Sequence, residues 1–357
     1  MNGKTWIRVF VLTFFALATP VVVINYTIDP LLNFSHTNAL NRKFEGFNER
    51  QQKTNYILNH HARYEGIILG SSRTTFINQN DFAGMQLFNY ASSAMWPFEY
   101  QGYIDYVRQL KGGALKAVVI GGDFYGIMEP LKIEFEKPES YIARALDPLD
   151  PFRNLLSIDT FKYSLRTLRL NLRSKYRMYY ERSMVKVQKK VEEKEFLARY
   201  TKNLIRHTKE FSEDNYRDNS SYFENLRQLK AANPGTKFIY FTSPVSADLF
   251  ASILINNDRF EEYRRWIRGV VDVFGEVYCF MGINSITTHL ENYPDDDHFY
   301  PAIGKILATK IATGDFDTEP KDFGTVVNAG NVEAFLAEEL EKVRRYRFSD
   351  VYPKDQF

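Results

Sequence analysis

The sequence predicts an α/β fold, a three-layer α/β/α sandwich with a parallel central sheet, an N-terminal transmembrane helix and a helical insertion. Three observations support this prediction. Short apolar runs alternate with amphipathic stretches along much of the 357-residue chain, a pattern typical of parallel strands joined by crossover helices. The first 28 residues are strongly apolar. A long basic segment of helical character separates the early strands from the later ones.

The N-terminal segment, residues 1–28, is expected to be a membrane anchor. Lys4 and Arg8 precede a charge-free apolar run over residues 9–24. At about 1.5 Å per residue, a helix through this segment is roughly long enough to cross a bilayer. The positive flank orients the N-terminus inward and sends the rest of the chain outward. A cleavable signal peptide is the alternative, because residues 16–18 fit a cleavage pattern, but the apolar run continues past them.

The rest of the chain is expected to divide into a connecting segment at 29–64, an α/β domain at 65–313 and a C-terminal extension at 314–357. Strands of the domain are expected at 65–69, 85–90, 115–120, 237–242 and 276–280. Helices are expected at 99–110, 222–232, 259–274 and 301–313. In the extension, residues 317–325 are polar and irregular, and an amphipathic helix is expected at 332–346. We expect this extension to lie apart from the sheet.

An insertion is expected at about 130–219. Residues 160–209 have a long helical pattern, and residues 159–210 hold 15 Lys or Arg against 6 Asp or Glu. The structural interpretation of this segment is a solvated helical hairpin. The functional interpretation is that its basic face lies near acidic lipid headgroups or an anionic envelope polymer. The net charge of the whole chain is only +2, so no strong attraction to nucleic acid is expected.

The main chemical signal is the run Ile67–Thr74 read together with Asp295–His298. The first segment places Ser72 at the carboxyl end of an apolar strand, where open α/β sheets carry their chemistry. The second supplies a histidine base and a carboxylate to orient it. Together they predict an activated serine. A structural serine at a turn or helix N-terminus is the alternative for Ser72, and Ser71 is the alternative nucleophile if the strand ends one residue earlier.

Four blocks of the sequence resemble the SGNH (GDSL-like) hydrolase superfamily: Gly70–Ser72, Phe88–Ala94, Ile120–Asp123 and Asp295–His298. The resemblance implies Ser72 as nucleophile, His298 as base and Asp295 as its orienting carboxylate. Ser71 stands where the family has an acidic residue, and Ala94 where it has an oxyanion-hole glycine. Asp123 replaces the family's oxyanion-hole asparagine.

The resemblance implies acyl transfer. Membrane-anchored members similar to DltD and the alginate-acetylation proteins work beside membrane acyltransferases on envelope polymers. We therefore expect a single-pass protein of a bacterial cell membrane, with its domain on the periplasmic or extracellular side. Its expected function is serine acyl-esterase or O-acyltransferase on an envelope polysaccharide. A non-catalytic glycan-binding or accessory member of the same fold is the alternative, and a flavodoxin-like binding domain is a weaker one.

Asp123 is the main difficulty for the enzymatic interpretation. An ionised carboxylate only accepts hydrogen bonds, and its charge opposes a developing oxyanion. Arg73 follows the nucleophile and is expected to neutralise Asp123 in a charge-assisted pair. Alternatively, Arg73 supplies positive charge to the oxyanion or to a substrate carboxylate.

No cofactor and no metal are expected. A single cysteine, Cys279, excludes an intrachain disulfide and a cysteine-based metal site. The aspartates at 295–297 suggest an acidic loop or a cation site as an alternative. However, they lack the glycine and the spaced ligands of an EF-hand, and no histidine spacing typical of zinc emerges.

Overall fold

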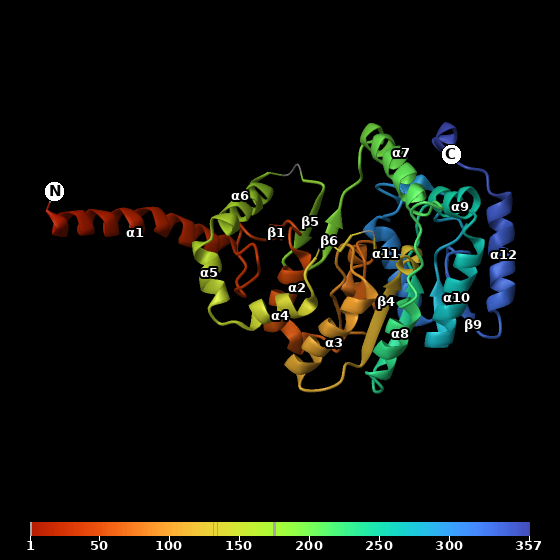
Figure 1. Ribbon diagram of the computed structural model, residues 1–357, viewed down its shortest axis with the longest axis horizontal. Coiled ribbons are helices and arrows are strands. Elements are labelled where there is room, and N and C mark those ends of the chain that lie inside the picture. The colour runs from red at the N-terminus through yellow and green to blue at the C-terminus, as the bar shows by residue number, and fades with distance from the viewer. Residues whose placement is uncertain (1, 131, 134, 174–175) are drawn as a thin grey trace. The chain divides into compact units, whose positions relative to one another are not determined.

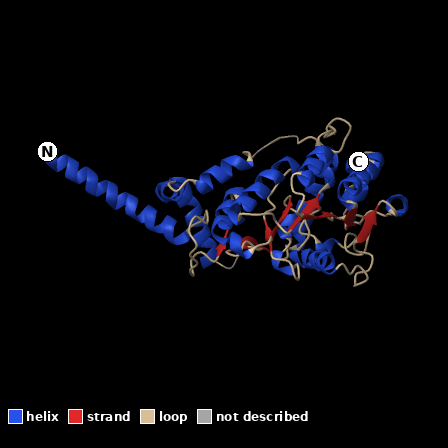
Figure 2. Ribbon diagram, turned by 90° about the horizontal axis from the view of Figure 1, so that it is seen from below, coloured by secondary structure: helices blue, strands red, loops and turns tan. Residues whose placement is uncertain are grey.

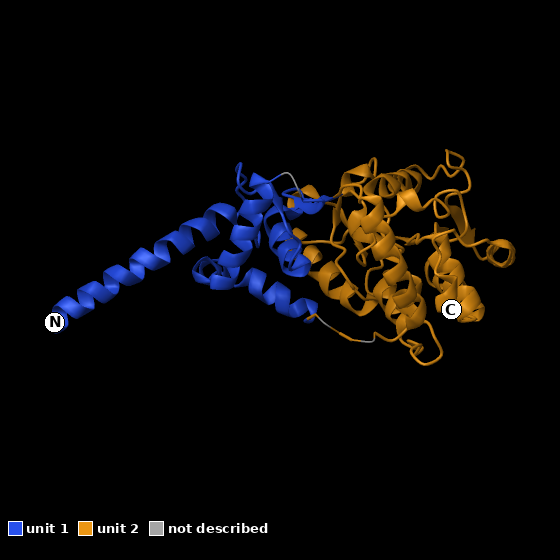
Figure 3. Cartoon of the chain, turned by 90° about the horizontal axis from the view of Figure 1, so that it is seen from above, with its two compact units in different colours: residues 1–61, 136–187 blue, residues 62–135, 188–357 orange. Residues whose placement is uncertain are grey.

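The computed structural model describes residues 2–130, 132–133, 135–173 and 176–357 (Figure 1). The chain forms two compact units, coloured separately in Figure 3. Unit 1 contains residues 1–61 and 136–187, and unit 2 contains residues 62–135 and 188–357.

Unit 2 is built on a six-stranded sheet with the strand order β3-β2-β4-β7-β8-β9. The strands are β2 (Gly66–Gly70), β3 (Leu87–Asn89), β4 (Ala117–Gly122), β7 (Lys237–Thr242), β8 (Glu276–Cys279) and β9 (Thr325–Asn328). The first five strands in this order pair in parallel. The predicted α/β class is therefore confirmed, with strands close to their expected positions.

The C-terminal extension corrects two expectations. Its strand β9 pairs antiparallel with β8, so the sheet is mixed and not purely parallel, and the extension does not lie apart from it. With four residues, β9 is too short to give a strand signal beside the polar stretch at 317–325. The helix after it, α12 (Val332–Arg345), is present as expected and packs against α10 (Phe260–Phe274).

The other helices of unit 2 are α3 (Pro97–Lys111), α7 (Glu193–Glu210), α8 (Tyr222–Ala231), α9 (Ala247–Asn256) and α11 (Pro301–Thr313). Helix α9 was not expected from the sequence. Its residues from 247 to 254 are all buried, so it has no amphipathic period to reveal it.

Both faces of the sheet are buried. Ala117 and Val119 of β4 belong to one apolar cluster with Leu307 of α11. Val118 and Ile120, which point to the opposite face, are also almost fully buried. Helices and strands of the whole chain are distinguished in Figure 2. Strands buried on both faces explain why the apolar runs of the sequence are continuous and not alternating.

Unit 1 contains α1 (Gly3–Ile28), α2 (Glu49–His60), α4 (Pro138–Leu146), α5 (Asp150–Leu156) and α6 (Ile158–Leu172). It also has a small sheet in the order β1 (Lys43–Phe44), β5 (Met178–Glu181) and β6 (Lys186–Gln188). The long helical pattern expected at 160–209 is therefore wrong, because β5 and β6 interrupt it. Strand β5 pairs with β1, more than 130 residues earlier in the chain, and such a partner leaves no local signal.

Helix α1 is long and apolar enough to cross a membrane by length and composition. It begins after Asn2, whose side chain accepts a hydrogen bond from the backbone N–H of Lys4. Its most apolar stretch is not covered by the rest of the chain. The predicted apolar helix is thus present, with Pro20 inside it.

Candidate active site

Ser72 lies just beyond the carboxyl end of β2. The strand ends at Gly70, which has a φ of +149°. A Cβ atom at Gly70 would lie 2.3 Å from Thr74 Oγ1 and 2.8 Å from the carbonyl oxygen of Gly121. Only glycine therefore fits at this position. The chain then turns into a short 3₁₀ helix, Thr74–Phe76, and Thr75 Oγ1 donates to the carbonyl of Ser72 at 2.5 Å, which fixes the turn.

His298 faces Ser72. Its Nε2 lies 2.8 Å from Ser72 Oγ, and its Nδ1 lies 3.1 and 3.2 Å from the two carboxylate oxygens of Asp295. Asp295 Oδ1 also accepts the backbone N–H of His298 at 2.8 Å. The structure thus brings together Ser72, His298 and Asp295 as the sequence predicted. With the proton on Nδ1, this arrangement leaves Nε2 free to accept the serine proton.

Ser71 is placed differently. It is almost fully buried, and its side chain is hydrogen-bonded to the Tyr125 hydroxyl. Its Oγ also accepts the backbone N–H of Arg73 at 3.4 Å. Of the two serines, Ser72 is the one that contacts His298, and Ser71 has a supporting position behind it.

Asp297 is a second carboxylate beside His298, and the sequence did not identify it as a site residue. Its Oδ1 lies 2.8 Å from His298 Nδ1. Burial lowers the pKa of His298, but Asp297 and Asp295 raise it, and the net result is a pKa of about 10. Burial raises the pKa of Asp297, but His298 and Arg73 bring it well below its usual range. The two carboxylates therefore favour the imidazolium form of His298 over the neutral imidazole.

Arg73 is buried between two carboxylates. Its Nη1 donates to Asp123 Oδ1 at 2.8 Å, its Nη2 to Asp297 Oδ2 at 3.1 Å, and its Nε to the backbone carbonyl of Asp297 at 3.0 Å. The guanidinium also lies over the Tyr125 ring, 5.1 Å from its centre. The expected Arg73–Asp123 pair is thus present. Because Arg73 holds two carboxylates, its charge is offset within the protein.

Asp123 and Ala94 are the two residues that the sequence led us to expect at an oxyanion hole. Asp123 follows β4 directly and is 7% exposed. Ala94 is exposed and adopts a left-handed conformation with a φ of +48°, which is costly for a residue with a Cβ atom. A glycine would adopt it freely. The backbone thus takes a glycine-like conformation at a position that the sequence fills with alanine.

Helix α7 adds residues that sequence reasoning missed. His207 Nδ1 lies 2.7 Å from Asp296 Oδ2, and Arg199 Nη2 lies 3.6 Å from Asp295 Oδ2. Burial raises the pKa of Asp296 to about 6, although His207 acts to lower it. The only available signal was electrostatic, since three consecutive aspartates require cationic partners when buried. Nothing local in the sequence identifies α7 as their source.

Two groups of side chains have the composition of a metal site: His207, Asp296 and Asp297, and Asp295, Asp297 and His298. In each group the ligand atoms lie within 4.8 Å of one another. However, Asp297 is paired with Arg73, and Arg206 Nη2 lies 2.7 Å from His207 Nε2. A cation would have to displace these positive partners, so we assign no metal to either group.

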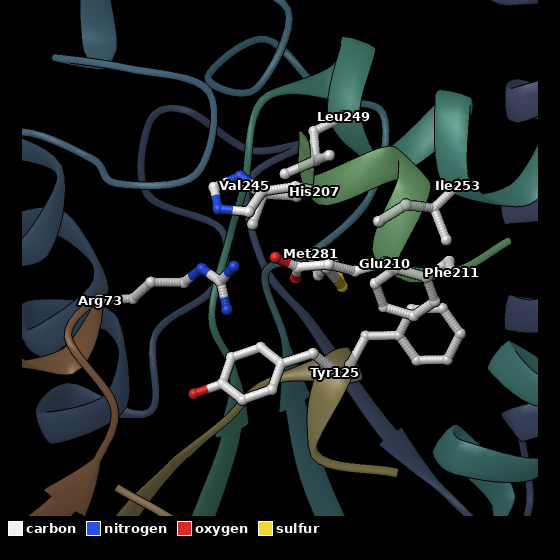
Figure 4. Close-up of a pocket in the computed structure, with 10 residues that line it drawn as sticks. Arg73, Tyr125, His207, Glu210, Phe211, Val245, Leu249, Ile253 and Met281 are labelled. Carbon is white, nitrogen blue, oxygen red and sulfur yellow. The ribbon is translucent and has the colours of Figure 1, made fainter. Parts of the chain in front are cut away.

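Two small pockets border Arg73 and Asp123. The first, of about 330 Å³, is shown in Figure 4 and combines polar and apolar side chains. It is lined by Arg73, Tyr125, His207 and Glu210 and by Phe124, Phe211, Val245, Leu249, Ile253 and Met281. The second, of about 220 Å³, lies where Trp96 and Tyr125 approach Asp123. These pockets place apolar surface close to the polar cluster, as ligand sites usually do.

No family model, no curated protein and no solved structure matches this chain. The resemblance to the SGNH hydrolases therefore stays a prediction from the four sequence blocks.

Proposed function

We propose that this chain is a membrane-tethered serine acyl-esterase or O-acyltransferase that acts on a cell-envelope polysaccharide or polymer. The observation that carries the proposal is the 2.8 Å contact between Ser72 Oγ and His298 Nε2, with Asp295 at the opposite nitrogen. Nucleophile, base and orienting carboxylate in this order are the arrangement of serine acyl transfer on several unrelated folds. No cofactor is required for this chemistry.

The proposed reaction begins with neutral His298. Ser72 Oγ attacks the carbonyl carbon of an ester, and its proton moves to His298 Nε2 while Asp295 stabilises the imidazolium. The bond between the acyl carbon and the alkoxy oxygen of the ester then breaks. The leaving alcohol takes the proton from His298, and an acyl-serine remains. Water or a sugar hydroxyl next gives its proton to His298 and attacks the acyl-serine. The bond between the acyl carbon and Ser72 Oγ then breaks, Ser72 Oγ takes the proton from His298, and a carboxylic acid or a new ester is released.

Topology supports membership in the SGNH superfamily as part of the proposal. The Ser72 and Asp123 blocks follow neighbouring parallel strands, since Gly70 of β2 pairs with Gly121 of β4. The block containing Ala94 follows β3, on the other side of β2. The proposal also includes the three-layer form of that superfamily.

Lys4 and Arg8 before the apolar stretch favour a single-pass anchor with the catalytic unit on the periplasmic or extracellular side.

A non-catalytic role, as a glycan-binding or accessory protein for a membrane acyltransferase, is the second candidate. Two observations favour it: Asp123 holds a carboxylate where an amide donor is expected, and His298 has a raised pKa of about 10. Both oppose nucleophilic attack at neutral pH. Trp96 beside the smaller pocket offers an aromatic ring for a sugar.

Serine-directed labelling tests the proposal. The full chain in detergent is treated with a fluorophosphonate and with an activated acetyl ester at pH 7 and pH 10, and adducts are located by peptide mass mapping. We expect an adduct on Ser72 that is absent from Ser72→Ala and His298→Ala but retained in Ser71→Ala, the adjacent-serine control. A folded chain that gives no adduct at either pH contradicts the enzymatic proposal and favours the accessory role.

A further inference from the structure

Five large apolar side chains are exposed on and around the short helix α5 of unit 1. These are Leu146, Leu149, Phe152, Leu156 and Ile158, with exposed fractions between 44% and 59%. Positions 149, 152 and 156 follow the i, i+3, i+7 spacing of one helix face. We call these five residues the α5 patch. An exposed group of large apolar side chains usually marks an interaction surface.

The α5 patch is fixed next to one end of α1. Asn25, in the last turn of α1, is 1% exposed. Its Nδ2 donates to the backbone carbonyls of Leu155 at 3.0 Å and Ser157 at 3.1 Å. Its Oδ1 accepts a hydrogen bond from Ser164 Oγ at 2.9 Å. Both α5 and α6 pack against α1 (Figure 1). A buried amide thus holds the end of α5 at a defined level along the apolar helix.

That level corresponds to the edge of a bilayer. A hydrocarbon core of about 30 Å requires about 20 helical residues, and the exposed apolar side chains of α1 extend from Trp6 to Val23. Asn25 therefore lies where α1 leaves the hydrocarbon. Tyr26, which is half exposed, follows it and contacts the Phe34 ring. Aromatic side chains with a polar group are typical of this boundary.

We infer that α5 lies in the membrane interface, with the α5 patch inserted among the lipid headgroups and the upper acyl chains. This inference rests on the bilayer-spanning α1 of the proposed function. Helix α5, which carries the patch, packs against α1 and is held to its last turn by the Asn25 hydrogen bonds. This position beside the apolar helix favours lipid over a protein partner. Exposed ion pairs, Arg153 with Asp147 and Lys162 with Asp159, lie beside the patch. An apolar face bordered by charged side chains is typical of interfacial helices.

The consequence is a two-part attachment. With the spanning helix as its single attachment, unit 1 would be free to change its orientation at the bilayer surface. Insertion of α5 would add a second attachment and hold unit 1 against that surface.

Depth-dependent quenching tests this inference. The full chain is placed in vesicles of phosphatidylethanolamine and phosphatidylglycerol. An environment-sensitive fluorophore is attached to Phe152→Cys, to Val23→Cys in α1, or to Leu172→Cys. Leu172 is the matched control, because it is 68% exposed and lies 14 residues beyond Ile158, roughly 21 Å along α6. The unsubstituted chain is the blank, since its single cysteine, Cys279, is buried.

We expect the probe at 152 to brighten several-fold in vesicles and to be quenched by lipids carrying a spin label near the headgroup. The probe at 172 should show neither effect. Quenching at 23 without quenching at 152 would overturn the inference and leave the α5 patch to a protein partner. Loss of quenching at both 23 and 152 would overturn the membrane anchor itself, so the two failures are distinguishable.

Discussion

The two sides of the candidate site differ in how their charged groups are used. On the nucleophile side, Asp295 and His298 hold each other in a geometry that points Nε2 at Ser72. On the side of the expected oxyanion hole, Asp123 is engaged with Arg73. Asp295 and His298 thus direct a nitrogen toward Ser72 Oγ, whereas Asp123 and Arg73 form hydrogen bonds with each other.

For the proposed acyl transfer, a well-formed hydrogen-bonded triad is not sufficient by itself. The nucleophile also needs a neutral base and donors for the oxyanion. Asp297 connects the two sides, because it contacts His298 with one oxygen and Arg73 with the other. Variants of these charged groups can therefore separate the contributions of the two sides.

The two carboxylates beside His298 should have unequal effects on activity. We expect Asp295→Asn to lower the rate of Ser72 acylation by roughly 10³- to 10⁴-fold, because it disturbs the tautomer and orientation of the imidazole. Compared at a pH where His298 is neutral in both variants, Asp297→Asn should cost much less, since Asp297 Oδ1 lies near Nδ1 without forming a well-aligned hydrogen bond. The measurement is the acylation burst with an activated ester. A larger loss in Asp297→Asn would identify Asp297 as the orienting carboxylate.

Acylation by Ser72 should increase with pH toward the pKa of His298. Only neutral imidazole accepts the serine proton, so with a pKa of about 10 the rate should rise about tenfold per pH unit below that value. Removing the Asp297 charge in Asp297→Asn lowers the pKa of His298 and should move the midpoint of the profile to lower pH. The check is the rate of phosphonate labelling between pH 6 and pH 11. A rate that is already constant above pH 7 would disagree with an imidazolium ground state.

Loss of Arg73 should destabilise the fold more than loss of an exposed arginine. Arg73→Met leaves Asp123 buried without its cation and removes one of the two cationic partners of Asp297. Breaking a buried ion pair in this way typically costs about 3–5 kcal/mol in the free energy of unfolding. The matched control is Arg268→Met, because Arg268 and Glu333 form a bidentate but exposed pair, whose loss should lower the free energy of unfolding far less. Urea unfolding of both variants compares them. Equal losses would mean that the Arg73 pairs contribute no more than surface pairs do.

Asp123→Asn should change esterase activity by less than about tenfold if Arg73 already neutralises Asp123. The substitution keeps the shape of the side chain, removes one carboxylate from Arg73 and adds an amide donor. Activity toward an activated acetyl ester measures the effect. A rise on the scale of a lost oxyanion donor, about 10²- to 10³-fold, would show that the native aspartate suppresses hydrolysis and would contradict a harmless pair.

Local signals predicted most of the sheet and the triad. Strand β7 and helix α11 occur at their expected residues, 237–242 and 301–313. A Pro-Gly turn precedes β7, and a proline opens α11. Ser72, His298 and Asp295 were identified because their positions relative to a strand end and a helix start could be read from the sequence. Ser72 follows the carboxyl end of β2 and His298 lies just before α11, and the fold brings Ser72 Oγ and His298 Nε2 to 2.8 Å.

The rest depends on contacts between distant residues. Strand β5 was hidden because its partner β1 lies more than 130 residues earlier, and β6 pairs only with β5. His207 was missed because Asp296 lies 89 residues away. Asp297 was known only as one of three acidic residues. Its role depends on the direction of its carboxylate, toward both Arg73 and His298. Neither periodicity nor motif spacing contains that direction.

Ala94→Gly gives the smallest expected effect and tests the expected oxyanion side most directly. A left-handed alanine costs roughly 1–2 kcal/mol, and glycine returns about 0.5–1 kcal/mol of this as conformational entropy. The free energy of unfolding should therefore rise by about 0.5–1 kcal/mol, since an exposed methyl group loses little packing. Ala94→Val, as control, should lower it, because a β-branched residue fits this conformation poorly. If Ala94→Gly also raised the rate of acylation more than tenfold, the backbone at 94 would take part in the reaction. The expected oxyanion side would then contribute to the reaction as the Asp295–His298 side does.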